Sequence, residues 1–120
     1  MIMTENELIP KKRPLMGLLV AGEENKESVL AGFKTITIRE GWRDYHTGDK
    51  VLIGCHLLNW ATLAKVTSVN FYVLKDIPLK DLQDDGFPTL EDALLSLSAY
   101  YQNINEDSPV TVIRWKLIEE

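Results

Sequence analysis

The segment GFKTITIR, residues 32–39, contains the clearest β-strand signal in the sequence. From Lys34 to Arg39 it is rich in β-branched residues, and its polar and apolar side chains alternate strictly. Because successive side chains of a strand point to opposite faces, the two isoleucines should share one face, and the two threonines and the arginine the other. Gly32 lies where a helix C-cap belongs, so a helix should end here and turn into this strand.

The rest of the sequence predicts an α+β fold around this strand. Alternation near residues 64–67 breaks, which indicates a bulge of the kind that barrels use. A long helical segment before the final strand would allow that strand to pair with an early one. Together these features predict a small bent sheet or β-barrel of about five to six strands with short helices at its side. The expected strands cover residues 14–20, 34–39, 50–58, 61–73 and 110–117, and the expected helical segments cover residues 23–31, 77–86 and a stretch beginning after Thr89.

Length and composition indicate one globular domain. The chain has 120 residues, of which 45% are hydrophobic and 26% charged, and a domain usually has about 100–200 residues. We expect residues 1–14 to form a flexible N-terminal arm, because two prolines bracket a short basic run there. Residues 15–120 should form the single domain.

Charge and cysteine content restrict the function classes. Thirteen basic and 18 acidic residues give a net charge of −5, whereas a protein held to nucleic acid mainly by phosphate neutralisation should be basic. Any nucleic-acid contact should therefore be local. The single cysteine excludes an internal disulfide, and we expect no metal and no cofactor because no zinc-ligand spacing occurs. The longest nearly apolar run, residues 15–21, is too short for a membrane helix, so we expect a cytoplasmic protein without a membrane partner.

Lys34 and Thr37 are candidate catalytic residues. At a helix-to-strand corner both side chains could face a cleft, where an uncharged amine can activate a hydroxyl nucleophile. Lys34 would then have to be partly desolvated. The neighbouring aspartates Asp84 and Asp85 are the best source of an orienting acid. The alternative is that Thr35, Thr37 and Arg39 are only the solvent face of an amphipathic strand.

The loop after this strand contains two aromatic residues, Trp42 and Tyr45, beside Arg43. Aromatic faces with a guanidinium can form a platform for a nucleobase. The same side chains could equally attach the loop to the barrel. The sequence alone favours neither interpretation.

The spacing Gly32-x-Lys34-x-x-x-x-Arg39 resembles the motif of the ASCH domain family, a branch of the PUA-like superfamily. The resemblance covers roughly Leu15 to Leu117 and implies a PUA-like small bent β-barrel with a cleft beside the motif. Members of that family are thought to bind RNA or nucleotides. Further matching segments are Thr47–Ile53, Ala64–Val69, Asp84–Phe87 and Val110–Trp115.

The segment 34–39 is also similar to bacterial ASCH amidohydrolases that deacetylate N-acetylated cytidine. Their catalytic lysine and threonine map onto Lys34 and Thr37. Their glutamate would fall near Asp84 or Asp85, which is one methylene shorter, and a displacement of about 1 Å can cost about a hundredfold in rate.

We therefore expect an ASCH domain that binds RNA or a modified nucleoside or nucleotide in the cleft. One alternative is a metal-independent amidohydrolase acting on N-acylated cytidine, with Thr37 as nucleophile, Lys34 as base and Asp85 or Asp84 as acid. A second alternative is a protein-interaction adaptor that uses the acidic flank around residues 81–107. The sequence predicts no oligomeric state. The predicted ligand-binding residues are Gly32, Lys34, Thr35, Thr37, Arg39, Trp42, Arg43 and Tyr45.

Overall fold

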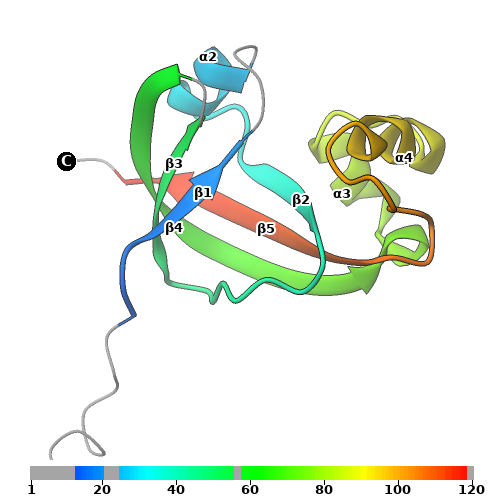
Figure 1. The fold of residues 1–120 in the computed structure, drawn as a ribbon. Coiled ribbons are helices and arrows are strands. Elements are labelled where there is room, and N and C mark those ends of the chain that lie inside the picture. Colours follow the sequence, from blue (N-terminus) through cyan, green and yellow to red (C-terminus); the bar gives the residue numbers. More distant parts are fainter. Residues whose placement is uncertain (1–12, 21–24, 56–57, 119–120) are drawn as a thin grey trace, which may run out of the picture.

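A computed structural model describes residues 13–20, 25–55 and 58–118. The expected N-terminal arm lies almost entirely outside these residues. Figure 1 shows the strands curling into a half-barrel, with α2 at one end and α3 and α4 beside β2. The described elements are β1 (Met16–Leu19), α2 (Asn25–Leu30), β2 (Ile36–Glu40), β3 (Lys50–Cys55), β4 (Leu58–Val73), the 3₁₀ turn η1 (Leu74–Asp76), α3 (Leu79–Asp84), α4 (Leu90–Ser98) and β5 (Pro109–Leu117).

The five strands form one mixed sheet in the order β1-β3-β4-β5-β2. β1 runs parallel to β3, and the other neighbours are antiparallel. The final strand β5 lies between β4 and β2, because the helical segment of residues 74–98 carries the chain back to the early strand. The register of β4 against β5 shifts between Val66 and Ser68, where the sequence predicted a bulge. The predicted α+β fold, a small bent sheet of about five to six strands with short helices at its side, is confirmed, with five strands that curl into a half-barrel (Figure 1).

Apolar clusters cover both faces of β5 and one face of β2. Ile36 and Ile38 belong to a cluster that includes Leu82 of α3 and Leu97 of α4. The opposite face of the sheet carries a second cluster, built mainly from β1, β3, β4 and β5. Thr37 consequently has only 8% of its surface exposed. The interpretation of its strand face as a solvent face is therefore wrong for Thr37, which is buried, and Thr35 and Arg39 are only partly exposed.

Two sets of ion pairs lie toward opposite edges of the sheet. The Arg114 guanidinium on β5 contacts the Asp81 carboxylate at 2.6 Å and the Asp84 carboxylate at 2.7 Å, which ties α3 to the sheet. Arg13 contacts the Asp49 carboxylate at 2.8 Å, before β3.

Within the described ranges, none of the helices has the length and apolar character needed to cross a membrane.

Candidate functional site

A cavity of about 440 Å³ lies beside β2. Its volume falls within the range of about 300–1,000 Å³ that is usual for small-molecule sites. Segments far apart in the sequence contribute to its wall, including β1, the start of α2, β2, the turn after α3 and the end of α4. The lining residues are Leu19, Asn25, Lys34, Thr37, Ile38, Arg39, Asp85, Phe87, Ser96, Leu97, Tyr100 and Tyr101.

The corner between α2 and β2 positions Lys34. Gly32 has a φ of +80°, in the left-handed region that favours glycine. The backbone N–H groups of Phe33 and Lys34 then both donate to the Ser28 carbonyl, at 2.8 and 3.0 Å. This arrangement ends α2 and turns the chain, so that the lysine lies on the cavity wall just before β2 begins.

The turn after α3 positions Asp85. The Asp85 N–H donates to the Asp81 carbonyl, and Gly86 follows with a φ of +92°. Because Arg114 holds α3 against β5, this turn lies next to the start of β2. The Lys34 ammonium donates to the Asp85 carboxylate at 2.6 Å, and their side chains are only 17% and 7% exposed.

The electrostatic environment of Asp85 is mixed. Burial raises the pKa of its carboxyl above the usual value, although the positive charges of Lys34 and Arg39 act in the opposite direction. The carboxyl is therefore easier to protonate than an exposed aspartate. A buried carboxyl that shares a short hydrogen bond with an amine is a suitable group for proton transfer within the cavity.

Arg39 lies on β2 and has two guanidinium nitrogens without a partner. Its Nε and Nη2 atoms are both shielded from solvent and make no hydrogen bond with the described residues. About nine in ten buried polar groups in proteins are hydrogen-bonded, so each exception requires an explanation. Since Arg39 also lines the cavity, a bound ligand is the simplest partner for these two donors.

The structure brings four of the predicted site residues together, and these are Lys34, Thr37, Arg39 and Asp85. Asp84 lies outside the cavity wall, where its carboxylate contacts Arg114 and Lys80. Asp85 is thus the aspartate that faces Lys34. Gly32 and Thr35 do not line the cavity either, although Gly32 shapes the corner that places Lys34.

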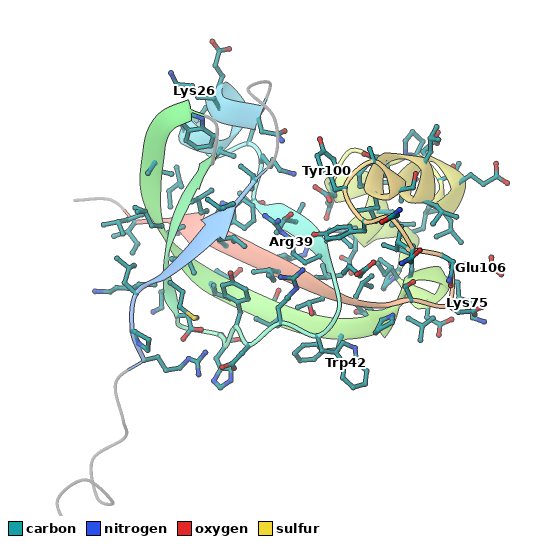
Figure 2. All side chains as sticks on the ribbon, viewed as in Figure 1. Lys26, Arg39, Trp42, Lys75, Tyr100 and Glu106 are labelled. Carbon is teal, nitrogen blue, oxygen red and sulfur yellow. The ribbon has the colours of Figure 1, made fainter. Side chains whose placement is uncertain are left out.

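The predicted aromatic platform of Trp42, Arg43 and Tyr45 does not border the cavity. Trp42 packs edge-on against Phe71, with ring centroids 6.3 Å apart. The Tyr45 hydroxyl donates to the Gly17 carbonyl at 2.7 Å, and the Arg43 Nε donates to the Glu40 carbonyl. These contacts attach the loop to the sheet, as the alternative interpretation held. Figure 2 shows Trp42 at the lower edge of the molecule, away from Arg39 and Tyr100.

Sequence reasoning missed the aromatic residues that do line the cavity, Phe87, Tyr100 and Tyr101. The helical spacing of Leu90, Leu97 and Tyr101 predicts core packing for this segment, and Tyr101 does pack against the apolar cluster that contains Leu97. However, α4 ends at Ser98, so both tyrosines follow the helix, and Tyr100 is 61% exposed. A pair of tyrosines at the end of an amphipathic helix is the signal that could have indicated this wall.

The crystal structure of hypothetical protein PH0355 resembles this fold with a TM-score of 0.63 and 22% identity, over 86% of this chain and 96% of that one. The ASCH domain structure from Lactobacillus crispatus JV V101 gives a TM-score of 0.61 and 12% identity, over 86% of this chain and 79% of that one. The fold is ASCH-like. Protein EF3133 from Enterococcus faecalis V583, a DUF984 protein, shares the ASCH-like fold with a TM-score of 0.64 and 12% identity, over 95% of this chain and 86% of that one.

No protein-family model and no curated protein matches the sequence. The predicted ASCH resemblance is nevertheless confirmed at the level of the fold. At these identities the likeness concerns the fold alone, so the chemistry of this ASCH-like domain has to be argued from its own cavity.

Proposed function

We propose that this ASCH-like domain binds RNA or a modified nucleoside or nucleotide in the cavity beside β2. The observation that carries the proposal is the unpartnered edge of the Arg39 guanidinium at the wall of a 440 Å³ cavity. Leaving two such donors without partners is costly for a folded protein unless a ligand supplies the acceptors. The ASCH-like fold is consistent with this class of ligand.

The chemistry of the wall supports a nucleoside-sized ligand. The hydroxyl of Thr37, the Lys34–Asp85 pair and the hydroxyl of Ser96 can exchange hydrogen bonds with the polar edges of a base or a ribose. Tyr100 offers an aromatic face, on which unpaired bases commonly stack. A mostly apolar wall with a few polar groups is the usual composition of a small-molecule site.

The proposal is tested by blocking the cavity. Binding of the common ribonucleosides, N-acetylated cytidine and short single-stranded RNA is measured by calorimetry. Ser96→Trp places a bulky side chain at the cavity wall and should weaken binding at least tenfold. Ser98→Trp is the matched control, because Ser98 lies on the same helix but outside the cavity. Equal affinities of the two variants would contradict binding at this site, provided that both melt as the unchanged protein does.

A second candidate function is hydrolysis of an N-acylated cytidine, supported by the presence of Thr37, Lys34 and Asp85 on one cavity wall. The Thr37 hydroxyl would attack the acyl carbon and the C–N bond would break, forming an acyl ester on the threonine and releasing the base amine. Lys34, after passing its proton to Asp85, would take the hydroxyl proton and return it to the leaving amine. Water would then hydrolyse the ester.

This alternative is tested by turnover of N-acetylated cytidine, with release of cytidine and acetate as the readout. Lys34→Ala and Thr37→Val should each abolish turnover. Lys65→Ala should not, because Lys65 is an exposed lysine on β4 outside the cavity. A chelator should leave the rate unchanged. Absence of turnover in the unchanged protein, together with binding of the same compound, would leave the binding function alone.

A further inference from the structure

We infer that the ligand of this cavity carries a phosphate group that is bound by the Arg39 side chain. The inference rests on the proposed function and narrows its ligand class from nucleosides in general to phosphorylated ones. It follows from the charges of the cavity wall and from the identity of the two unpartnered nitrogens.

The charges of the described cavity wall do not cancel. The residues of this wall whose side chains are ordinarily charged at neutral pH are Lys34, Arg39 and Asp85. The Asp85 carboxylate lies 2.6 Å from the Lys34 ammonium, which compensates that positive charge. No carboxylate of the described residues forms an ion pair with Arg39, so the wall retains one positive charge. An uncompensated cation in a poorly solvated place favours an anionic ligand over a neutral one.

The two unpartnered atoms also define the shape of the acceptor. The hydrogens on Nε and Nη2 point in nearly the same direction, along one side of the planar guanidinium. This side matches two oxygens of a single phosphate, each accepting one of two parallel hydrogen bonds. A lone carbonyl oxygen of a neutral base would satisfy only one of the two donors.

Access to this edge requires a small rearrangement. Because Nε and Nη2 are shielded from solvent in the structure, a phosphate reaches them only when a side chain of the cavity wall moves or Arg39 changes rotamer. The rearrangement is favourable because the phosphate then accepts two charge-assisted hydrogen bonds from nitrogens that otherwise have no partner. The phosphate of a nucleotide and the phosphodiester of RNA share this chemistry, and the test below separates them.

The test compares ligands that differ by one phosphate. Calorimetry measures the affinity of the common ribonucleosides, their 5′-monophosphates and the dinucleoside monophosphates for the full chain. In the unchanged protein a phosphorylated ligand should bind at least about tenfold more tightly than its parent nucleoside, as two charge-assisted hydrogen bonds imply. A stronger preference for the monophosphates indicates a free nucleotide, and one for the dinucleoside monophosphates indicates RNA.

The variants assign the preference to Arg39. Arg39→Gln should weaken binding of the phosphorylated ligands more than binding of the parent nucleosides, so that the phosphate preference falls to less than about twofold. Arg39→Lys, which retains the charge but not the two-pronged geometry, should keep only part of the preference. Lys65→Gln removes one positive charge outside the cavity and should leave the phosphate preference unchanged. Melting temperatures establish that each variant is folded.

Other outcomes would overturn the inference. Equal affinity of the unchanged protein for nucleosides and their phosphates would refute it, as would a phosphate preference that survives Arg39→Gln. In both cases nucleoside binding would still support the proposed function. Failure of every nucleoside, nucleotide and dinucleotide to bind would instead refute both.

Discussion

The cavity wall carries two cationic side chains, Lys34 and Arg39, which lie five positions apart in the sequence and have opposite environments. The ammonium of Lys34 contacts a nearly buried carboxylate, whereas one edge of the Arg39 guanidinium is shielded from solvent and has no hydrogen-bond partner among the described residues. The first arrangement satisfies both charges. The unpartnered donors of Arg39 lower the free energy of unfolding. A residue that lowers stability in this way at a cavity wall is characteristically a binding residue.

Replacement of Arg39 should therefore stabilise the free protein. Arg39→Met keeps most of the apolar stem and removes the unpartnered donors, so the free energy of unfolding should rise by about 1 kcal/mol. The measurement is urea denaturation followed by circular dichroism. Lys65→Met is the control, since an exposed substitution should change stability by no more than about 0.5 kcal/mol. A decrease in the stability of Arg39→Met would contradict the description of its guanidinium as unsatisfied.

The Lys34–Asp85 pair should show strong coupling. Lys34→Met leaves a buried carboxylate without its partner, which costs about 3–5 kcal/mol, and Asp85→Leu leaves the ammonium alone. The double variant should recover much of this loss. A thermodynamic double-mutant cycle from urea denaturation measures the coupling, and additive effects of the two substitutions would show that the contact is not maintained in solution.

The Lys34–Asp85 pair also predicts that the free energy of unfolding depends on pH. Burial raises the pKa of Asp85 above its value in the unfolded chain, so protonation of this group favours the folded state. The resulting stability is present at acidic pH, below the unfolded value, and is lost as the pH rises through the folded value. The destabilisation caused by Lys34→Met should consequently be smaller near pH 4 than at pH 7.

At the scale of elements, a buried carboxylate fastens the end of the loop between β2 and β3. Asp49 accepts hydrogen bonds from the Arg13 Nε at 2.8 Å and from the His46 N–H at 2.7 Å. Burial acts to raise the pKa of Asp49, but Arg13 and His46 lower it below the usual range on balance. The ionised carboxylate thus fastens the segment before β1 to the loop before β3.

Asp49→Asn should lower the free energy of unfolding by about 1–2 kcal/mol at pH 7, since one charged acceptor is lost. A lowered folded pKa means that this stability is present above the unfolded value and disappears as the pH falls through the folded value. The difference between the two proteins should therefore shrink below about pH 4. Thermal melts over a pH series test this. Asp44→Asn, an exposed neighbour at 3.4 Å from Arg13, should have little effect.

Most elements could be predicted from sequence because local signals coincide with the final structure. The strict alternation of residues 34–39 produced β2, and Thr89 caps α4 by accepting a hydrogen bond from the Asp92 N–H. The sequence did not predict which neighbours a side chain contacts where those contacts depend on packing between distant segments. Trp42 and Tyr45 could contact either a ligand or the sheet, and only the positions of Phe71 and Gly17 decide that.

The composition of the site was predictable in part for the same reason. Lys34, Thr37 and Arg39 lie within one short segment, so local geometry relates them. Asp85 is 51 residues from Lys34, and the choice between it and Asp84 depends on which carboxylate Arg114 engages. The tyrosines at 100 and 101 could not be placed at the cavity wall, because the end of α4 cannot be located from periodicity alone.

On the scale of the whole molecule, charge limits how the protein can bind RNA. The net charge is −5, and the described cavity wall offers one uncompensated cation. Long RNA should therefore be bound weakly, with recognition confined to the few nucleotides that reach the cavity.

The salt dependence of binding should be shallow. For a short single-stranded RNA with one or two phosphate contacts, the logarithm of the association constant should fall with the logarithm of salt concentration with a slope of about −0.7 to −1.4. Fluorescence anisotropy of a labelled tetranucleotide between about 50 and about 200 mM salt measures the slope. A slope steeper than about −3 would indicate a broad basic surface and contradict recognition through a single pocket.

The position of β5 between β4 and β2 has a consequence for biosynthesis. Among the described strands β2 pairs with β5 alone, so the segment that carries Thr37 and Arg39 lacks this sheet partner until Pro109–Leu117 has left the ribosome exit tunnel. The earlier strands can pair while translation continues, but the pocket cannot assemble on a nascent chain that lacks this segment. Recognition should thus require the β2–β5 pairing, and stalled chains truncated before residue 109 should have none.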